Sequence, residues 1–191
     1  MAEVLAETER LILRDWDDED EVRFYEVMNR EEVMQHLGGL QSFGEWGAAY
    51  KRVRGYSRDF GYTFWVMEDR KTGDILGFCG IKRVNSPGAG PLTGMHEIGW
   101  RIRHEAWGKG IAKEAAIASL DLAFGRFGAP HVVALTIPKN EPSWGLMRRL
   151  GMKRREDMDF TDRRFGPEVN PQIVYWLDSA DWPAARAAAL S

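Results

Sequence analysis

The first strand is expected over residues 11–15, Leu-Ile-Leu-Arg-Asp, where an apolar run is followed by charged residues. Leu11 and Leu13 share one face of this segment, and Ile12 and Arg14 share the other. Two aspartates follow at positions 17 and 18, and acidic residues suit the first turn of a helix. Apolar residues then recur at positions 22, 25 and 28, which is a helical spacing. The beginning of the chain therefore predicts a strand and then a helix.

The middle of the chain predicts a second helix and a hairpin. We expect the helix over residues 43–57 and the two strands over residues 62–67 and 74–84, joined by a polar turn. Residues 85–94 contain three glycines and two prolines, so we expect a loop there.

The second half of the chain alternates strand and helix patterns. We expect a strand over residues 97–102 and, after a glycine-containing turn, a helix whose apolar positions 111, 115, 118 and 122 form one buried stripe. Asn140 is expected to cap a further helix, with Pro142 in its first turn, between strands at 131–137 and 152–160. Residues 172–177 form the last expected strand. This order predicts an α+β fold: a mixed, mainly antiparallel sheet of six to seven strands flanked by about four helices on both faces.

The composition agrees with one globular domain. The chain has 191 residues, of which 44% are apolar and 29% are charged. Domains of about 100 to 200 residues are usual, and we expect a single domain over residues 7–178, with an alanine-rich tail at 179–191 that forms a short helix. The single cysteine, Cys79, lies in an apolar run, so an inert core thiol is favoured over a nucleophile.

Charge and motifs argue against several classes of protein. The acidic N-terminal residues lack a basic start and a long apolar segment, so we expect no signal peptide, no membrane span and a cytoplasmic location. The net charge of -3 argues against a nucleic-acid partner, although it allows a local basic patch. Four scattered histidines and no paired cysteines offer no set of metal ligands.

The turn at residues 107–112, Trp-Gly-Lys-Gly-Ile-Ala, carries the strongest chemical signal. It opens a helix, where the first N–H groups lack partners and the helix dipole is positive, so we expect an anion there. The two glycines let the backbone approach phosphate oxygens, and basic residues at positions 103, 109 and 113 add positive charge. The sequence has no P-loop pattern and no Gly-x-Gly-x-x-Gly after an N-terminal strand, which disfavours nucleotide triphosphatases and dinucleotide enzymes.

At these residues the sequence resembles the GNAT superfamily of acetyl-CoA-dependent N-acetyltransferases. The signature of that family, Gln/Arg-x-x-Gly-x-Gly/Ala, is matched by Gly110 and Ala112, with Trp107 in place of Gln or Arg. A Trp-Gly-Lys-Gly turn followed by Ala-x-Glu-Ala, as at residues 112–115, is similar to the branch of ribosomal-protein N-terminal acetyltransferases (RimJ/RimL-like). The similarity extends over about residues 7–178. It includes Thr-Glu-Arg-Leu-Ile-Leu-Arg at residues 8–14, the Glu-Ile-Gly-Trp strand and Asn-x-x-Ser at residues 140–143.

The resemblance implies transfer of an acetyl group from acetyl-CoA to a primary amine by direct attack, without a metal. An alkyl ammonium with a pKa of about 10.4 must first lose a proton, whereas a protein α-amino group at roughly 7.7 to 8.0 is already partly neutral. The resemblance puts a protein N-terminus first as acceptor, with amino acids, polyamines and aminoglycosides as alternatives. In the family, the segment of the first two helices and their connecting Gly38-Gly39 builds the acceptor pocket.

Glu97 is the first candidate for a general base that acts through a water. Strand alternation places Glu97 and Arg101 on one face, and a structural pairing of Glu97 with Arg101 or with a neighbouring strand is an equal alternative. The carboxylates at residues 157–162 are second candidates and could attract a cationic acceptor, although a solvated loop is the commoner interpretation. His96 and His104 could titrate near neutrality, but a core or surface histidine is the commoner role.

Ser143 and Asn140 resemble the family's residues near the sulfur and the pantetheine arm of CoA. Ser143 would donate a hydrogen bond to the departing thiolate, a modest task because the pKa of a thiol is roughly 8.5. Asn140 would bind the pantetheine arm. The alternative role of both residues is helix capping. The backbone N–H of Ile102 or of a neighbour would stabilise the oxyanion.

The remaining cofactor contacts implied by the resemblance lie on the strand that begins at Glu97 and on the turn. Trp107 cannot form an ion pair with phosphate, and an anchor in the core is favoured over contact with the cofactor. Trp46 and Tyr50 fit a wall of the acceptor site and a core face equally well. The expected cofactor-binding residues are Trp100, Ile102, Arg103, Trp107, Gly108, Lys109, Gly110, Ile111, Ala112, Lys113, Asn140 and Ser143.

Two other functions stay open. A non-catalytic CoA-binding module would hold CoA without amine-dependent turnover. A partner such as aminoacyl-tRNA is a weaker hypothesis and would require salt-sensitive binding to tRNA. We expect a monomer or a homodimer.

Overall fold

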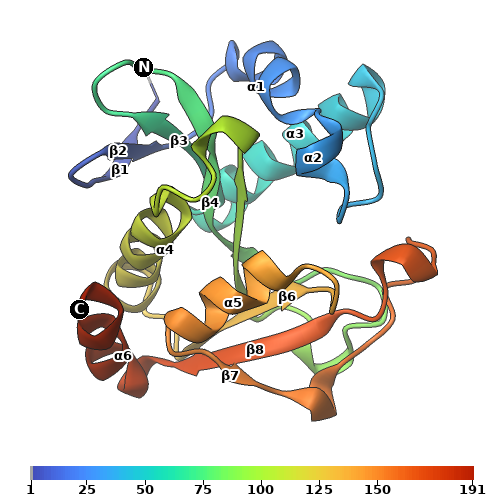
Figure 1. The fold of residues 1–191 in the computed structure, drawn as a ribbon, viewed down its shortest axis with the longest axis vertical. Coiled ribbons are helices and arrows are strands. Elements are labelled where there is room, and N and C mark those ends of the chain that lie inside the picture. Colours follow the sequence, from blue (N-terminus) through green and yellow to red (C-terminus); the bar gives the residue numbers. More distant parts are fainter. Residues whose placement is uncertain (1) are drawn as a thin grey trace. The chain divides into compact units, whose positions relative to one another are not determined.

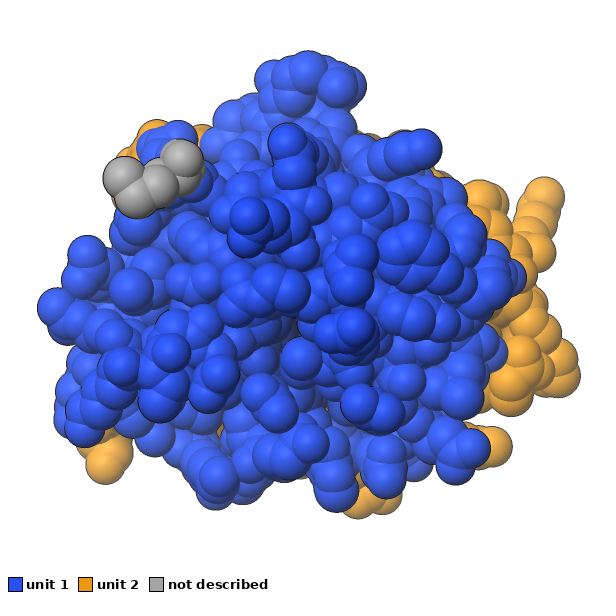
Figure 2. Space-filling view, turned by 90° about the horizontal axis from the view of Figure 1, so that it is seen from above, with its two compact units in different colours: residues 1–82, 99–119 blue, residues 83–98, 120–191 orange. Residues whose placement is uncertain are grey.

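The structure is a computed structural model that describes residues 2–191. The chain divides into two compact units (Figure 2). Unit 1 holds residues 1–82 and 99–119, and unit 2 holds residues 83–98 and 120–191.

Unit 1 combines antiparallel strands with helices (Figure 1). Four strands pair in sequence order, each antiparallel to the next: β1 (Val4–Glu7), β2 (Leu11–Arg14), β3 (Phe64–Asp69) and β4 (Ile75–Arg83). Three helices connect β2 to β3: α1 (Asp20–Met28), α2 (Glu31–Met34) and α3 (Phe43–Phe60). The unit ends with the second half of β5 (His96–Ile102) and most of α4 (Ile111–Asp121).

Unit 2 holds the remaining strands and two helices. Strand β6 (His131–Thr136) runs parallel to the first half of β5, and β8 (Ile173–Asp178) is antiparallel to β6. The two-residue strand β7 (Lys153–Arg154) pairs with β8. The helices are α5 (Glu141–Arg149) and α6 (Trp182–Leu190), and α6 lies in the tail where we expected a short helix.

The strands follow the order β1-β2-β3-β4-β5-β6-β8-β7. The described pairings are antiparallel except that of β5 with β6. The mixed, mainly antiparallel α+β fold is therefore confirmed. The described residues form eight strands and six α-helices, more than the six to seven strands and four helices expected. Among them, no helix is both long enough and apolar enough to cross a bilayer.

Three details of the predicted elements were wrong. Strand β1 was not predicted, because its four residues are half-buried or exposed and show no alternation. In α1, Met28 is fully buried as expected, but Val22 is 51% exposed and the fully buried Phe24 takes its place on the apolar face. Residues 152–160 form the short β7, a helical turn and a single bridge from Phe160 to Gln172 instead of one strand.

Phe24 of α1 lies in an aromatic cluster of unit 1. Its ring stacks on Trp46 of α3, with centroids 5.4 Å apart, and on Phe78 of β4, with centroids 6.0 Å apart. Trp46 donates its indole N–H to the carbonyl of Glu21 at 2.8 Å. Trp46 and Tyr50 are only 6% and 5% exposed. Both residues therefore pack in the core, the second of the two roles that the sequence allowed.

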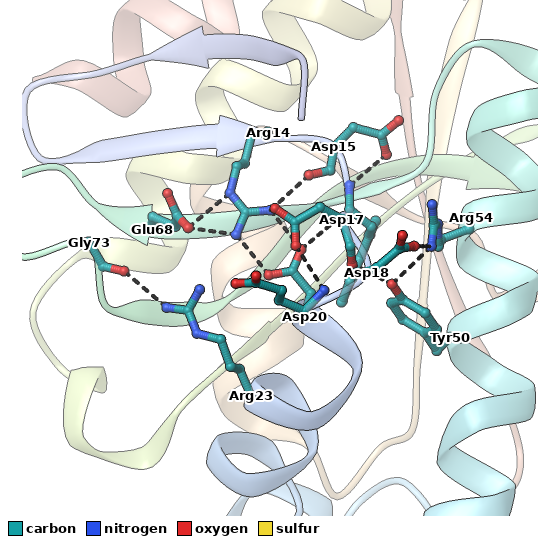
Figure 3. A network of polar contacts seen from close by, with 12 residues as sticks. Arg14, Asp15, Asp17, Asp18, Asp20, Arg23, Tyr50, Arg54, Glu68 and Gly73 are labelled. Carbon is teal, nitrogen blue, oxygen red and sulfur yellow. Dashed lines mark hydrogen bonds and ion pairs between the residues drawn. The ribbon is translucent and has the colours of Figure 1, made fainter. Parts of the chain in front are cut away.

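Arg14 lies on the face of β2 opposite Leu13 but is nearly buried (Figure 3). Its guanidinium donates to both carboxylate oxygens of Asp20 at 2.7 and 2.8 Å, and to Glu68 at 2.6 and 2.9 Å. Burial disfavours the charge of Arg14, but the hydrogen bonds and charges of these two carboxylates outweigh burial and raise its pKa. Because Asp20 is fully buried, the network ties β2, α1 and β3 together.

Cys79 on β4 is fully buried, as expected for an inert core thiol. It accepts a hydrogen bond from Ser119 of α4 at 3.4 Å. Burial raises the pKa of its thiol to about 12. The nucleophilic thiolate is therefore strongly disfavoured in the folded chain.

Candidate active site

The turn before α4 has the backbone that its two glycines predict. Gly108 and Gly110 adopt φ values of +71° and +76°, in the left-handed region that glycine enters readily. No heavy atom lies within 4 Å of the position that a Cβ of Gly108 would occupy. The N–H of Glu114 donates to the carbonyl of Gly110 at 3.1 Å. The N–H groups of residues 111–113 donate to no main-chain carbonyl among the described residues, as is usual for the first turn of a helix. A hydrogen-bond acceptor can therefore approach the turn closely.

Lys109 and Lys113 supply positive charge at this turn. Neither ammonium group forms an ion pair with any residue in the part of the chain that the structure describes. Arg103 differs, because its guanidinium donates to Glu105 at 3.1 Å and to the carbonyl of Ile75 at 3.4 Å. The two lysines are thus free to meet an anion, whereas Arg103 already has partners.

Trp107 is not the core anchor that the sequence favoured, since its side chain is 43% exposed. Its indole N–H donates to the carbonyl of Ile102 at 2.8 Å. The ring of His104 meets the indole edge-on, with centroids 4.8 Å apart. This hydrogen bond holds Trp107 at the end of β5 and joins the turn to that strand, while much of the indole stays in solvent.

A second contact of the turn was not foreseen from the sequence. Glu114 of α4 accepts hydrogen bonds from Thr8 Oγ1 at 2.6 Å, from the N–H of Arg10 at 2.9 Å and from Arg10 Nε at 2.6 Å. Arg10 also donates to the carbonyl of Lys109 at 2.8 Å. Burial disfavours the charge of Glu114, but these hydrogen bonds outweigh burial and lower its pKa. The Thr-Glu-Arg and Ala-x-Glu-Ala segments, both part of the family resemblance, therefore contact each other.

Asn140 and Ser143 lie at the start of α5 in unit 2. Asn140 occupies the N-cap position, yet its side chain makes no capping hydrogen bond. Neither its amide nor the hydroxyl of Ser143 has a hydrogen-bond partner among residues 2–191. Both residues are half-buried. The helix-capping alternative is therefore wrong for these two side chains, and both are available to a ligand.

Glu97 is half-buried on β5, in register with Val133 of the parallel strand β6. The structural alternative for Glu97 was a pairing with Arg101 or with a neighbouring strand. Arg101 forms no ion pair with the described residues, so pairing with Arg101 is wrong, and pairing of Glu97 with a neighbouring strand stays an alternative.

His96 and His104 have the ordinary roles expected. His96 is 7% exposed, and burial, followed by the charges of Arg83 and His131, lowers its pKa to about 4. It is therefore neutral near pH 7. His104 is exposed beside Trp107.

The acidic residues at 157–162 have cationic partners of their own. Asp157 pairs with Arg155 at 2.8 Å, and Asp159 pairs with Arg154. Asp162 is 2% exposed, so it does not belong to a solvated loop. Burial disfavours the charge of Asp162, but its bonds with Arg164 outweigh burial and lower its pKa. These carboxylates are thus neutralised locally, which weakens their candidacy as bases.

The expected site residues divide between the two units. Unit 1 brings together those at the end of β5 and the start of α4, and unit 2 holds those on the first half of β5 and on α5. The first group is Trp100, Ile102, Arg103, Trp107, Gly108, Lys109, Gly110, Ile111, Ala112 and Lys113, and the second is Glu97, Asn140 and Ser143.

Comparisons with known proteins agree with these observations. The acetyltransferase (GNAT) domain family matches residues 10–153. The chain is 30% identical over 146 residues to the uncharacterised protein YkkB of Bacillus subtilis, covering 76% of this chain and 83% of that protein. It is 27% identical over 165 residues to the uncharacterised N-acetyltransferase YoaA of Bacillus subtilis, covering 78% of this chain and 83% of that protein.

The fold also resembles a solved structure of RimL, a ribosomal L7/L12 alpha-N-protein acetyltransferase. The TM-score is 0.72 at 13% identity, with 93% of this chain and 95% of that chain covered. At this identity the likeness shows the fold alone. Because the family match spans most of the chain and the glycine turn opens α4 as that family requires, the chain belongs to the GNAT family of acetyl-CoA-dependent N-acetyltransferases.

Proposed function

We propose that this N-acetyltransferase belongs to the RimJ/RimL-like branch and acetylates the α-amino group of a protein N-terminus. The Trp-Gly-Lys-Gly turn with its following Ala-x-Glu-Ala and the likeness in fold to RimL support this branch. A protein α-amino group also needs less help from a base, because at a pKa of roughly 7.7 to 8.0 it is partly neutral at physiological pH. An amino acid, a polyamine or an aminoglycoside is the alternative acceptor.

The turn at residues 107–112 is the observation that carries the proposal. A diphosphate fits this turn for three reasons. There is open space at Gly108, main-chain N–H groups lie at the start of α4, and the ammonium groups of Lys109 and Lys113 are free. Acetyl-CoA, when bound, supplies the acetyl thioester. The proposed cofactor contacts are Trp100, Ile102, Arg103, Trp107, Gly108, Lys109, Gly110, Ile111, Ala112, Lys113, Asn140 and Ser143.

Three side chains of unit 2 have proposed roles in the reaction. Glu97 accepts the proton of the acceptor ammonium through a water. Ser143, whose hydroxyl has no partner in residues 2–191, donates a hydrogen bond to the sulfur as the thiolate departs. Asn140 uses its free side-chain amide to bind the amide-containing pantetheine arm.

Thiol release from acetyl-CoA tests the proposal. A peptide with a free N-terminus should produce thiol, and the same peptide with a blocked N-terminus should not. Ser143→Ala should slow turnover by about 10- to 100-fold, since one hydrogen bond to developing charge is lost. Ser179→Ala, a change at an exposed serine of the same unit, is the matched control and should leave the rate unchanged.

The alternatives give different results in the same assay. A small-molecule enzyme would turn over amines from a small-amine panel but not peptides. A non-catalytic CoA-binding module would bind CoA yet release no thiol with any amine between about pH 7 and 9. The cytoplasmic location, the single domain over residues 7–178 and the monomeric or homodimeric state stay predictions.

A further inference from the structure

Arg101 of β5 carries a positive charge without a negative partner. No described residue forms an ion pair or a hydrogen bond with its side chain, and its Nε is closed to solvent. Burial lowers the pKa of the guanidinium to about 10, so it is still charged near pH 7. A charge that is partly removed from water and unpaired is unfavourable for folding. Stability alone therefore does not explain an arginine at this position.

Aromatic rings of unit 1 lie against this guanidinium. Arg101 Cζ lies 5.2 Å from the centroid of Phe78, and Phe78 stacks on Phe64 with centroids 5.1 Å apart and 5° between the ring planes. Lys82 Nζ lies 5.7 Å from the centroid of Phe64. Two cations thus lie over one stacked pair of rings, an arrangement that favours them electrostatically.

Gly99 makes room for the ring of Phe64. A Cβ at position 99 would lie 2.7 Å from Cζ of that ring, so a larger residue would displace it. Positions 99 and 101 share one face of β5 because alternate residues of a strand point the same way. We call Phe64, Phe78, Lys82, Gly99 and Arg101 the cationic aromatic face. Its members are half-buried apart from the more deeply buried Phe78, so a ligand can reach them.

The strand that carries Arg101 is bonded to the proposed CoA turn. Arg101 precedes Ile102, whose carbonyl accepts the indole N–H of Trp107 at 2.8 Å. The N–H of Arg103 donates to the carbonyl of Leu76 on β4 at 2.8 Å. The end of β5 is therefore held by both the turn and β4, which gives Arg101 a rigid base.

We propose that the cationic aromatic face binds an acceptor amine that also carries a carboxylate, and that Arg101 receives this carboxylate. The inference rests on the proposed function, acetyl transfer to an amine. A guanidinium binds a carboxylate through two parallel hydrogen bonds. The positive charge of Arg101 also disfavours the ammonium form of a nearby amine, so more of the acceptor is the neutral nucleophile. The carboxylate belongs either to a free amino acid or to an acidic side chain next to a protein N-terminus.

Matched pairs of acceptors distinguish these two sources. Alanine and alaninamide differ in the α-carboxylate, whereas the peptides Ser-Asp-Ala-Ala-amide and Ser-Asn-Ala-Ala-amide differ in one acidic side chain. For each pair, thiol release gives the ratio of kcat/KM for the wild type and for Arg101→Met. The amines of one pair differ in pKa, but they do so equally for both proteins. Comparing the kcat/KM ratio of the wild type with that of Arg101→Met therefore cancels this difference. Arg126→Met is the matched control, since Arg126 is exposed and lies 5.3 Å from the ring of Phe127.

We expect the wild type to prefer the carboxylate member of one pair by about 10- to 100-fold, and Arg101→Met to lose most of this preference. Arg126→Met should keep it. The pair that shows the preference identifies the source of the carboxylate. A wild type without preference in either pair, or an unchanged preference in Arg101→Met, would overturn the proposal.

Two further measurements separate this proposal from a structural role and from failure of the proposed function. Because Arg101→Met removes an unpaired charge, its Tm should equal or exceed that of the wild type. A lower Tm together with an unchanged preference for the carboxylate acceptor would show that Arg101 has a structural role, and would overturn the proposal. If no amine is acetylated, the proposed function fails, and calorimetry still tests the carboxylate site with two pairs of products: N-acetylalanine with N-acetylalaninamide, and the N-acetylated forms of the two peptides. Tighter binding of the carboxylate member of either pair that depends on Arg101 supports the site, and equal binding within both pairs refutes it.

Discussion

Glu114→Ala is the substitution whose consequences the structure defines best. The carboxylate of Glu114 is 18% exposed and accepts hydrogen bonds from Thr8 at 2.6 Å and from Arg10 at 2.9 and 2.6 Å. A hydrogen bond to a charged group contributes about 1.5–3 kcal/mol when buried, and an exposed ion pair contributes roughly 0–1 kcal/mol. Because Arg10 is 43% exposed, we expect a total loss near the lower end, about 2–3 kcal/mol in the free energy of unfolding.

Urea unfolding measures this loss directly. Glu31→Ala is the matched control, because Glu31 also lies in the first turn of a helix but has no bonded partner among the described residues. The loss in Glu114→Ala should depend on pH. The folded-state pKa of Glu114 is lowered, so its contribution is present above the unfolded-state pKa and disappears as pH falls through the folded value. Equal stability of Glu114→Ala and Glu31→Ala at pH 7 would refute this account.

The same substitution should affect the proposed cofactor site. Arg10 donates to the carbonyl of Lys109 at 2.8 Å, so loss of Glu114 frees Arg10 and loosens the turn. We expect the KM for acetyl-CoA to rise by about 10-fold with a smaller change in kcat, since the turn binds the cofactor without touching the reacting atoms. If Glu114→Ala lowers the stability but leaves the KM for acetyl-CoA unchanged, the Glu114 contact stabilises the fold without affecting cofactor binding.

Three further predictions follow from buried groups. Asp20→Ala should lower the free energy of unfolding by about 3–5 kcal/mol, because it leaves the guanidinium of Arg14 only partly paired; a loss below about 1 kcal/mol in urea unfolding would contradict this. Cys79 should react with a thiol reagent only after unfolding, because burial raises its pKa to about 12; rapid reaction of the native protein would contradict its burial. Burial lowers the folded-state pKa of His96 from 6.5 to about 4, so the unfolded state binds the proton first and stability falls as pH drops through that window. His96→Gln should remove about 1–3 kcal/mol of that acid sensitivity in unfolding measurements at pH 7 and pH 4, and an unchanged pH dependence would contradict it.

Local patterns predicted most of the elements that hold the candidate site. The turn at residues 107–112 and the strand before it were correctly located, because glycine positions and strand alternation depend on neighbouring residues. The hairpin of β3 and β4 was found for the same reason, and α3 was found with a difference of three residues at its end. Strand β1 was missed because its short and partly exposed residues carry no such local pattern.

Contacts between distant residues could not be predicted from one sequence. Arg10 and Glu114 are 104 positions apart, and nothing in either segment specifies the other as its partner. The same is true of Arg14 and Glu68, which are 54 positions apart. Their contact accompanies the burial of Arg14, a charged strand residue that the sequence alone would not place in the interior. Alternation placed Arg101 on the correct face of β5, but the absence of an ion pair depends on the side chains that pack beside it. Side-chain pairing of this kind is set by packing in three dimensions.

The central claim is that main-chain N–H groups between Trp107 and Lys113 bind the diphosphate of coenzyme A, and isothermal titration calorimetry tests it most directly. The wild type should bind CoA at least about 10-fold more tightly than pantetheine, which lacks the phosphates. Gly108→Ala should weaken CoA binding, whereas Gly73→Ala, at an equally open glycine with φ of +72° against +71° for Gly108, should not. Equal affinity for CoA and pantetheine, or equal CoA affinity of the two variants, would contradict the claim.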